Sequence, residues 1–154
     1  MGCFSTAYAQ SDSLHADALA SNAVYAELGG PALYYSFNYD RMVIQSVGFR
    51  MGFGLVKGSD QHWSVMLPIF INLLPGANSW SSSNFEFDAG VVYHSSGVSI
   101  WYETANSSGL FYSLGLGYRY ESADEGILFR ITVTPLFFSD QIFPYGGVSF
   151  GWAF

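Results

Sequence analysis

The sequence predicts an all-β fold, an eight-stranded antiparallel up-and-down transmembrane β-barrel, and three observations support this prediction. Of 154 residues, 50% are hydrophobic and 19% aromatic, whereas only 11% are charged, well below the share of about 25% in soluble domains. Gly or polar residues interrupt every apolar run before it reaches the roughly 18 residues of a transmembrane helix. Apolar residues alternate with small or polar ones, as in strands with two different faces.

A closed barrel follows from the physics of the membrane. Every backbone polar group in a membrane span must find a partner within the protein, because lipid offers none. Without helices of sufficient length, strands joined into a ring are the solution that remains. The chain length leaves room for one such domain.

The net charge and the number of potential metal ligands limit the classes of function that the chain can have. The formal charge is −7, with five Lys and Arg residues, so the chain lacks the basic surface that nucleic acid requires. The three histidines are scattered, and a lone cysteine, Cys3, cannot form an intramolecular disulfide. We therefore expect no nucleic-acid partner, no metal site and no cofactor.

The N-terminus is expected to precede the folded domain. Residues 1–9 end in Ala7-Tyr8-Ala9, which has the small-x-small form of a signal-peptidase site. We interpret them as the remnant of a signal peptide, with an accidental match as the alternative. We do not expect a lipoprotein signal, because Cys3 has no apolar box ahead of it. Residues 10–22 are polar, as in a periplasmic lead, and residues 23–154 form the predicted barrel.

Turn residues divide the barrel region into segments of strand length. The first two segments, 23–30 and 33–41, are separated by Gly29-Gly30-Pro31. In the third segment, 47–56, Val, Phe, Met and Leu alternate with Gly and Arg, and a Lys-Gly-Ser-Asp turn follows at 57–60. Most of the predicted strands reach the roughly 9 to 11 residues that a tilted membrane strand needs.

The fourth and fifth segments lie on either side of a Pro-Gly turn. Segment 62–74 leads into that turn at 74–78, and segment 85–93 alternates apolar residues with Glu, Asp and Gly. Because Pro68 cannot donate a ladder hydrogen bond, we expect a bulge there. Residues 94–108 form the longest connection and are rich in Ser, which predicts a large loop.

The last three segments show the clearest alternation. In 110–120 every second residue, starting at 110, is Leu or Tyr. A turn at 122–126 leads to 127–137, where Pro135 again predicts a bulge, and 144–154 ends the chain. An even number of strands places both termini on one side, which we expect to be periplasmic, so that the long loop is extracellular.

The residues of each strand fall into two alternating sets, here called parities, which point to opposite faces of the wall. The composition of the two parities predicts which face is inside. Gly recurs on one parity, which suits the interior of an eight-stranded barrel that is just wide enough for side chains. Charged residues of both signs share this parity, and we expect a hydrogen-bonded network, because an unpaired charge in the lumen would be strongly destabilising. The predicted lumen residues are Glu27, Asp40, Arg50, Glu86, Asp88, Arg119 and Arg130, with Glu121 at the end of its segment.

A soluble lipocalin-like ligand carrier is the alternative barrel, with the apolar parity inside. A solvated outer surface would carry more lysine than the single Lys57, so we expect the apolar parity to face lipid. Aromatic residues on this parity lie toward strand ends, as in the girdles at the two membrane interfaces. The predicted girdle residues are Tyr35, Tyr39, Trp63, Tyr93, Tyr118, Tyr120 and Trp152.

The last ten residues alternate in polarity and stop on an aromatic residue. Gly147, Phe150, Trp152 and the terminal Phe154 resemble the C-terminal targeting strand of bacterial outer-membrane proteins, although Tyr145 stands where that pattern prefers a more polar residue. The resemblance implies that the barrel-assembly machinery recognises this strand and that it closes the barrel against the first strand.

A broader resemblance concerns the whole chain, which looks like the small OmpA/OmpX-type barrels. Its opening from Asn22 to Arg41 is similar to uncharacterised outer-membrane proteins of Bacteroidetes-type bacteria. These resemblances imply the bacterial outer membrane as the location, with membrane lipid and lipopolysaccharide as partners. They assign no activity.

Some small outer-membrane barrels are enzymes, so lipid A acyl chemistry is an alternative function. His94-Ser95-Ser96 resembles the His-x-Ser of lipid A deacylases, with Glu103 as the carboxylate that could orient His94. In that family the motif lies nearer the C-terminus and is followed by an Asn that this chain lacks. We expect His94 to be solvated at a loop edge. Lipid A palmitoyltransferases hold an acyl chain in an apolar half-lumen, whereas the lumen predicted here is charged.

An open pore is also disfavoured, because eight strands leave space for side chains but not for a water channel. The sequence therefore predicts a non-enzymatic barrel with a filled lumen. It has one of two roles: a structural element of the outer membrane, or a surface protein whose 94–108 loop binds a partner through Trp101 and Tyr102.

Overall fold

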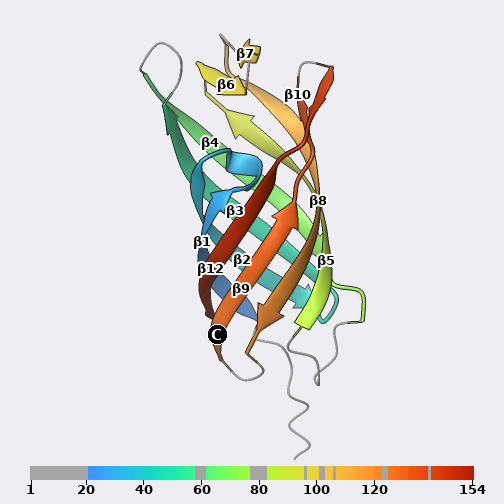
Figure 1. The fold of residues 1–154 in the computed structure, drawn as a ribbon. Helices are drawn as coiled ribbons and strands as arrows, with labels where there is room; N and C mark the ends of the chain where they lie inside the picture. Colours follow the sequence, from blue (N-terminus) through green and yellow to red (C-terminus); the bar gives the residue numbers. More distant parts are fainter. Residues whose placement is uncertain are drawn as a thin grey trace, which may run out of the picture.

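A computed structural model describes residues 21–57, 62–76, 83–95, 97–100, 103–105, 107–122, 125–138 and 140–154. The described residues form a barrel wall of eight strands (Figure 1). These are β1 (Asn22–Gly29), β2 (Tyr35–Ile44), β3 (Val47–Lys57), β4 (Trp63–Leu73), β5 (Ser83–His94), β8 (Gly109–Glu121), β9 (Gly126–Val133) and β12 (Gly146–Ala153). Each pairs with the next in an antiparallel ladder. The predicted eight-stranded up-and-down barrel is confirmed.

The barrel closes where the two ends of the folded region meet. β12 pairs with β1 from Ala153↔Ala23 to Gly147↔Gly29. Asn22 and Phe154 add two backbone hydrogen bonds of 3.0 and 2.8 Å. The last strand therefore closes the barrel against the first. We call the end of the barrel that holds these two residues the terminal end, and the opposite end the far end (Figure 1).

The two prolines inside predicted strands interrupt the wall in different ways. Opposite Pro68 in β4, the β3–β4 ladder omits Gly52 and Phe53 and then resumes in the same register. The expected bulge is therefore wrong, because the missing donor removes local pairing without adding a residue. Pro135 ends β9, and the segment resumes as β10 (Leu136–Phe138), so the predicted single strand is two strands that both pair with β8.

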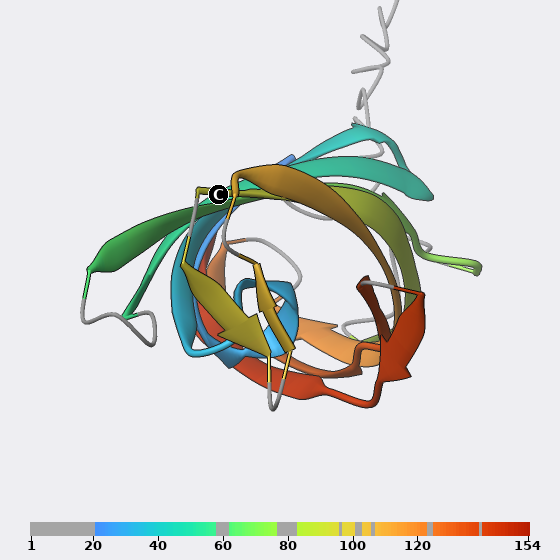
Figure 2. The same cartoon turned by 90° about the horizontal axis from the view of Figure 1, so that it is seen from above.

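Short elements gather at the far end, where Figure 2 looks down onto the barrel mouth. The 3-10 helix η1 (Gly30–Ala32) is buried there. A hairpin of β6 (Val98–Ile100) and β7 (Glu103–Ala105) lies over the mouth, within the connection that the sequence predicted as a loop. β10 and β11 (Gln141–Phe143) extend the wall. In the described part of the chain, no helix is long and apolar enough to cross a membrane.

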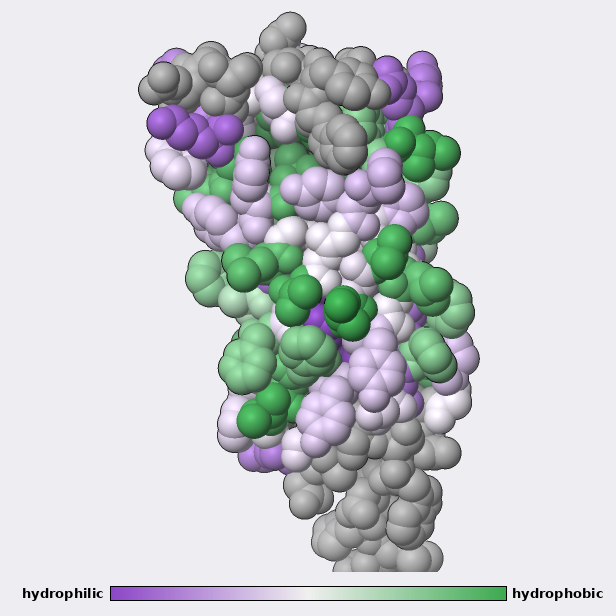
Figure 3. Space-filling view, in the orientation of Figure 1, coloured by the Kyte–Doolittle hydropathy of each residue, from purple (hydrophilic) through white to green (hydrophobic). Residues whose placement is uncertain are grey.

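The outer wall carries the large apolar side chains of the parity predicted to face lipid. Leu116 and Ile131, for example, are 52% and 49% exposed, and hydrophobic residues gather around the middle of the barrel in Figure 3. Such a surface exceeds the apolar patches of soluble monomers. The lipocalin-like alternative is therefore wrong, since it requires this parity to be inside.

The predicted girdle residues lie toward the two ends of the wall. Tyr35, Trp63 and Tyr93 stand near the far ends of their strands, and Tyr118, Tyr120 and Trp152 near the terminal end. All six are exposed. Tyr39 is half-buried, and its hydroxyl donates a 2.7 Å hydrogen bond to the Asn22 side chain. The aromatic residues thus form two bands, as expected at two membrane interfaces.

Candidate functional site

The lumen holds a buried ion-pair network between two apolar clusters. All seven charged residues predicted for the lumen lie inside it, together with Glu121, and none is more than 5% exposed. They come from β1, β2, β3, β5, β8 and β9. Because alternate residues of a strand point to the same face, charges from six strands converge on the interior. We call these eight side chains the lumen network.

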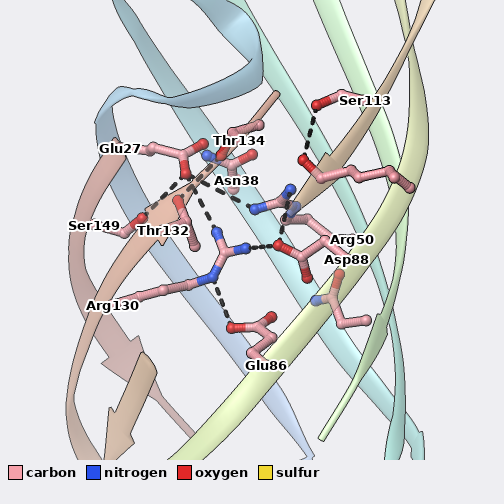
Figure 4. Close-up of polar contacts among 12 residues, drawn as sticks. Glu27, Asn38, Arg50, Glu86, Asp88, Ser113, Arg130, Thr132, Thr134 and Ser149 are labelled. Carbon is pink, nitrogen blue, oxygen red and sulfur yellow. Dashed lines mark hydrogen bonds and ion pairs between the residues drawn. The ribbon is translucent and has the colours of Figure 1, made fainter. Parts of the chain in front are cut away.

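Arg130 on β9 is bound to carboxylates from two other strands (Figure 4). Its Nε donates to Glu86 Oε2 at 2.7 Å, and its Nη1 donates to Glu27 Oε1 at 3.2 Å. Its Nη2 donates to Asp88. A guanidinium presents its donors in fixed, coplanar directions, so Arg130 holds β9 in a defined relation to β1 and β5.

A second group of ion pairs surrounds Arg119 on β8. Nη1 lies 2.7 Å from Asp40 Oδ2, and Nε lies 2.9 Å from Glu121 Oε2. Nη1 is also 3.9 Å from Glu86 Oε1. Since Glu86 contacts both Arg119 and Arg130, it joins the two groups into one network.

Arg50 on β3 occupies the boundary between the lumen network and the apolar part of the lumen. Its Nη1 and Nη2 lie 3.8 Å from Glu27 and from Asp88, respectively. Its guanidinium carbon stands 4.4 Å from the centre of the Phe70 ring. This cation–π contact connects the ion pairs to the apolar cluster that contains Phe70.

Neutral side chains connect the two remaining strands to the network. Asn72 of β4 donates a 2.8 Å hydrogen bond to Asp40, and the Ser149 hydroxyl of β12 donates to Glu27 at 3.4 Å. Each of the eight wall strands therefore contributes at least one polar group. Such mutual pairing offsets the large cost of removing these charges from water.

The lumen network pairs its charges internally. Each carboxylate of the lumen network forms an ion pair with at least one arginine, and all are shielded from solvent. Within the described ranges, no three His, Cys, Asp or Glu side chains are placed to hold a metal ion. The ion pairs of the lumen network thus join side chains of β1, β2, β3, β5, β8 and β9.

The far half of the lumen is apolar, which the sequence analysis missed. It contains a cluster of buried side chains from the wall, η1, β6, β10 and β11: Ala32, Leu33, Val56, Met66, Phe70, Val92, Val98, Ile100, Phe111, Leu136, Phe138 and Phe143. The expectation of a charged lumen is correct only for part of its length. The sequence does indicate this apolar half, because the inward-facing residues near the far ends of the strands include Val56, Met66, Val92 and Phe111.

Of the three residues considered for acyl transfer, the structure describes only the side chain of His94. His94 ends β5 but is only 3% exposed. Its ring centre lies 5.9 Å from that of Phe111 and 5.7 Å from that of Phe138. The prediction of a solvated loop-edge histidine is wrong, because the inward parity of β5 carries it into the apolar cluster. Ser96 and the Glu103 side chain lie outside the described residues, as do Trp101 and Tyr102.

The predicted assembly signal lies on the closing strand. Gly147 pairs with Gly29 of β1 on one side and Thr132 of β9 on the other. Phe150, Trp152 and Phe154 are exposed on the outer wall. The aromatic residues of the pattern thus face outward.

Comparisons with known proteins identify the fold. No family model and no curated protein matches the sequence. Among solved structures, the chain is similar to the N-terminal β-barrel domain of Pseudomonas aeruginosa OprF, with a TM-score of 0.66 and 12% sequence identity. The similarity covers 88% of this chain and 99% of the OprF chain. The fold is therefore that of an outer-membrane β-barrel of the OmpA/OmpX type.

Proposed function

We propose that this chain is an integral protein of the bacterial outer membrane whose barrel is closed to solutes and has a structural role. The observation that carries the proposal is the filled lumen. Ion pairs and hydrogen bonds among side chains of all eight wall strands occupy one part, and a large apolar cluster occupies the far half. A barrel of this size has no room for a water channel beside such a filling.

The proposed orientation has both termini in the periplasm. At the terminal end, β2 and β3 are joined by only two residues, 45–46, whereas residues 95–108 connect β5 to β8 at the far end. Outer-membrane barrels have short periplasmic turns and longer extracellular loops. The outward aromatic residues of the last strand support recognition by the barrel-assembly machinery.

A conductance measurement tests the closed barrel. Purified protein fused into planar bilayers is expected to give no stepwise current, with a known porin as the control for fusion. The filled lumen offers ions no continuous water path. Repeated openings of uniform size would contradict the proposal.

Surface interaction is the second candidate function, and one feature of the far end favours it. A pocket of about 230 Å³ lies between the segment after η1, β6 and the segment before β12. Its lining includes Tyr34 and Tyr145, and Tyr residues are enriched at binding interfaces. Lipopolysaccharide or a surface protein could contact this end of the barrel. Deleting 95–108, which removes β6, should abolish cell-surface binding. Unchanged binding would exclude a role for this connection.

Lipid A acyl hydrolysis has no support from the placement of His94. The Nδ1 atom of His94 lies 3.0 Å from the backbone oxygen of Ser95, rather than beside a described carboxylate. Two phenylalanine rings pack against the imidazole. Mass spectrometry of lipid A should therefore give the same acylation for wild type and His94→Ala, and a difference between them would restore the catalytic alternative.

A further inference from the structure

A groove crosses the outer wall at the seam of β12, β1, β2 and β3, with a volume of about 730 Å³. It arises because Ala26 is small, whereas its cross-strand partners are Phe37 on β2 and Phe150 on β12. Phe53 and Trp152 continue the rim. The groove therefore lies between large apolar side chains on the surface that faces lipid.

A polar residue lines the terminal end of the groove, and a basic residue lies beyond it. Tyr39 lines the groove, and its hydroxyl binds Asn22. Arg41 follows Tyr39 by two residues on the same face of β2, roughly 7 Å nearer the terminal end, and its side chain is exposed. Of the two basic residues outside the lumen, Arg41 and Lys57, only Arg41 lies at this end of the barrel.

We propose that the groove binds an acyl chain of a glycerophospholipid whose phosphate pairs with Arg41. This inference rests on the proposed location of the barrel in a membrane. The apolar lining matches a hydrocarbon chain, and a guanidinium forms charge-assisted, often bidentate hydrogen bonds with phosphate. The volume lies within the range of small-molecule sites. Arg41 thus provides a positive charge that can pair with the phosphate of the headgroup. A surface that contacts only hydrocarbon does not need such a charge.

A pair of alanines provides a matched test of the acyl-chain part. Ala26→Phe would fill the groove, and Ala26→Leu is a milder filling in case the larger side chain prevents folding. Ala89→Phe is the control, because Ala89 is an exposed alanine of β5, between Ile71 and Leu114 and outside the groove. Protein refolded into vesicles of phosphatidylglycerol and phosphatidylethanolamine is extracted in detergent, and native mass spectrometry measures the fraction that retains phospholipid.

A second pair tests the headgroup. Arg41→Gln removes the positive charge beside the groove, whereas Lys57→Gln removes one at the opposite end. We expect the Ala26 substitutions to lower the affinity for retained phospholipid about tenfold, and Arg41→Gln to lower it mainly for phosphatidylglycerol. Ala89→Phe and Lys57→Gln should match wild type.

Two results would overturn the proposal. Equal retention by Ala26→Phe, Ala26→Leu and Ala89→Phe would show that no chain occupies the groove. Efficient disulfide cross-linking of Ala26→Cys in a Cys3→Ser background in vesicles would show a second copy of the barrel there instead. The same unboiled samples are also run on a denaturing gel, which tests whether the membrane barrel is folded. If a variant migrates as a compact barrel but retains as much lipid as wild type, only the lipid site is contradicted.

Discussion

Arg130 contacts carboxylates on two strands that are distant in the sequence, Glu27 on β1 and both Glu86 and Asp88 on β5. Removing one partner from a buried ion pair leaves uncompensated charge, which is more costly than replacing the whole pair by apolar groups. The stability of this barrel should therefore depend strongly on Arg130.

Arg130→Met tests that dependence. We expect the free energy of unfolding to fall by about 3 to 5 kcal/mol, measured by urea unfolding in lipid vesicles with tryptophan fluorescence. Lys57→Met, at an exposed position, should change it by no more than about 0.5 kcal/mol. Adding Glu86→Gln to Arg130→Met should recover part of the loss. If Arg130→Met alone lowered the free energy of unfolding by less than about 1 kcal/mol, the ion pairs of Arg130 would contribute little to stability.

A substitution at Leu116 tests whether this face of the wall contacts lipid. Its neighbours across the ladders are Phe87 and Val133, both exposed. Leu116→Arg should destabilise the barrel by about 2 to 4 kcal/mol in vesicles, and Tyr120→Arg, nearer the interface, by no more than about 1 kcal/mol. Equal effects of the two substitutions would contradict the assigned depth.

The charged part of the lumen could be predicted from the sequence, whereas the packing between distant segments in its apolar far half could not. Charge on the inward parity is distinctive, so all seven predicted residues lie in the lumen. Phe111 and His94 share that parity, but their packing depends on Phe138, which reaches them only because β10 continues beyond Pro135. Such a contact between distant segments has no local signature.

At the scale of elements, the closing pair β12–β1 depends on close backbone approach. An added Cβ at Gly151 would stand 2.1 Å from the Val24 backbone oxygen and 2.5 Å from the Tyr25 Cα. Neither atom can move without separating the two strands. The seam therefore requires a residue without a side chain at this position.

Gly151→Ala is expected to lower the free energy of unfolding by about 1 to 3 kcal/mol through overpacking. Gly109→Ala is the control, because its nearest neighbour is the His94 Nε2 atom at 3.1 Å, at the end of a side chain. Both variants are compared by urea unfolding in vesicles. Equal midpoints would show that the seam tolerates the methyl group.

All eight wall strands were predictable, because most of the segments alternate in polarity and most have turn residues at their ends. The short elements were not. β6 exists because Val98 and Ile100 enter the apolar cluster, and η1 is buried against wall strands rather than stabilised by its own three residues. Tertiary packing, not local propensity, decides whether segments of three residues become ordered.

For the whole molecule, a closed ladder and a cross-linked interior predict resistance to detergent. Unboiled protein should migrate faster on a denaturing gel than boiled protein, because the folded barrel remains more compact than the unfolded chain. Arg130→Met should lose this difference at a lower temperature than wild type. Equal mobility of boiled and unboiled wild type would weigh against a closed barrel.

The proposed barrel has one parity against lipid and the other in a sealed lumen, and cysteines at neighbouring positions test this arrangement most directly. In a Cys3→Ser background, Cys would replace buried Ser113, Thr132 or Ser149, and separately the exposed neighbours Leu114, Ile131 or Val148. In vesicles, a lipid-soluble thiol reagent should label only the second set, and a water-soluble reagent neither. Labelling of Cys at 113, 132 or 149 by the water-soluble reagent would contradict the sealed lumen.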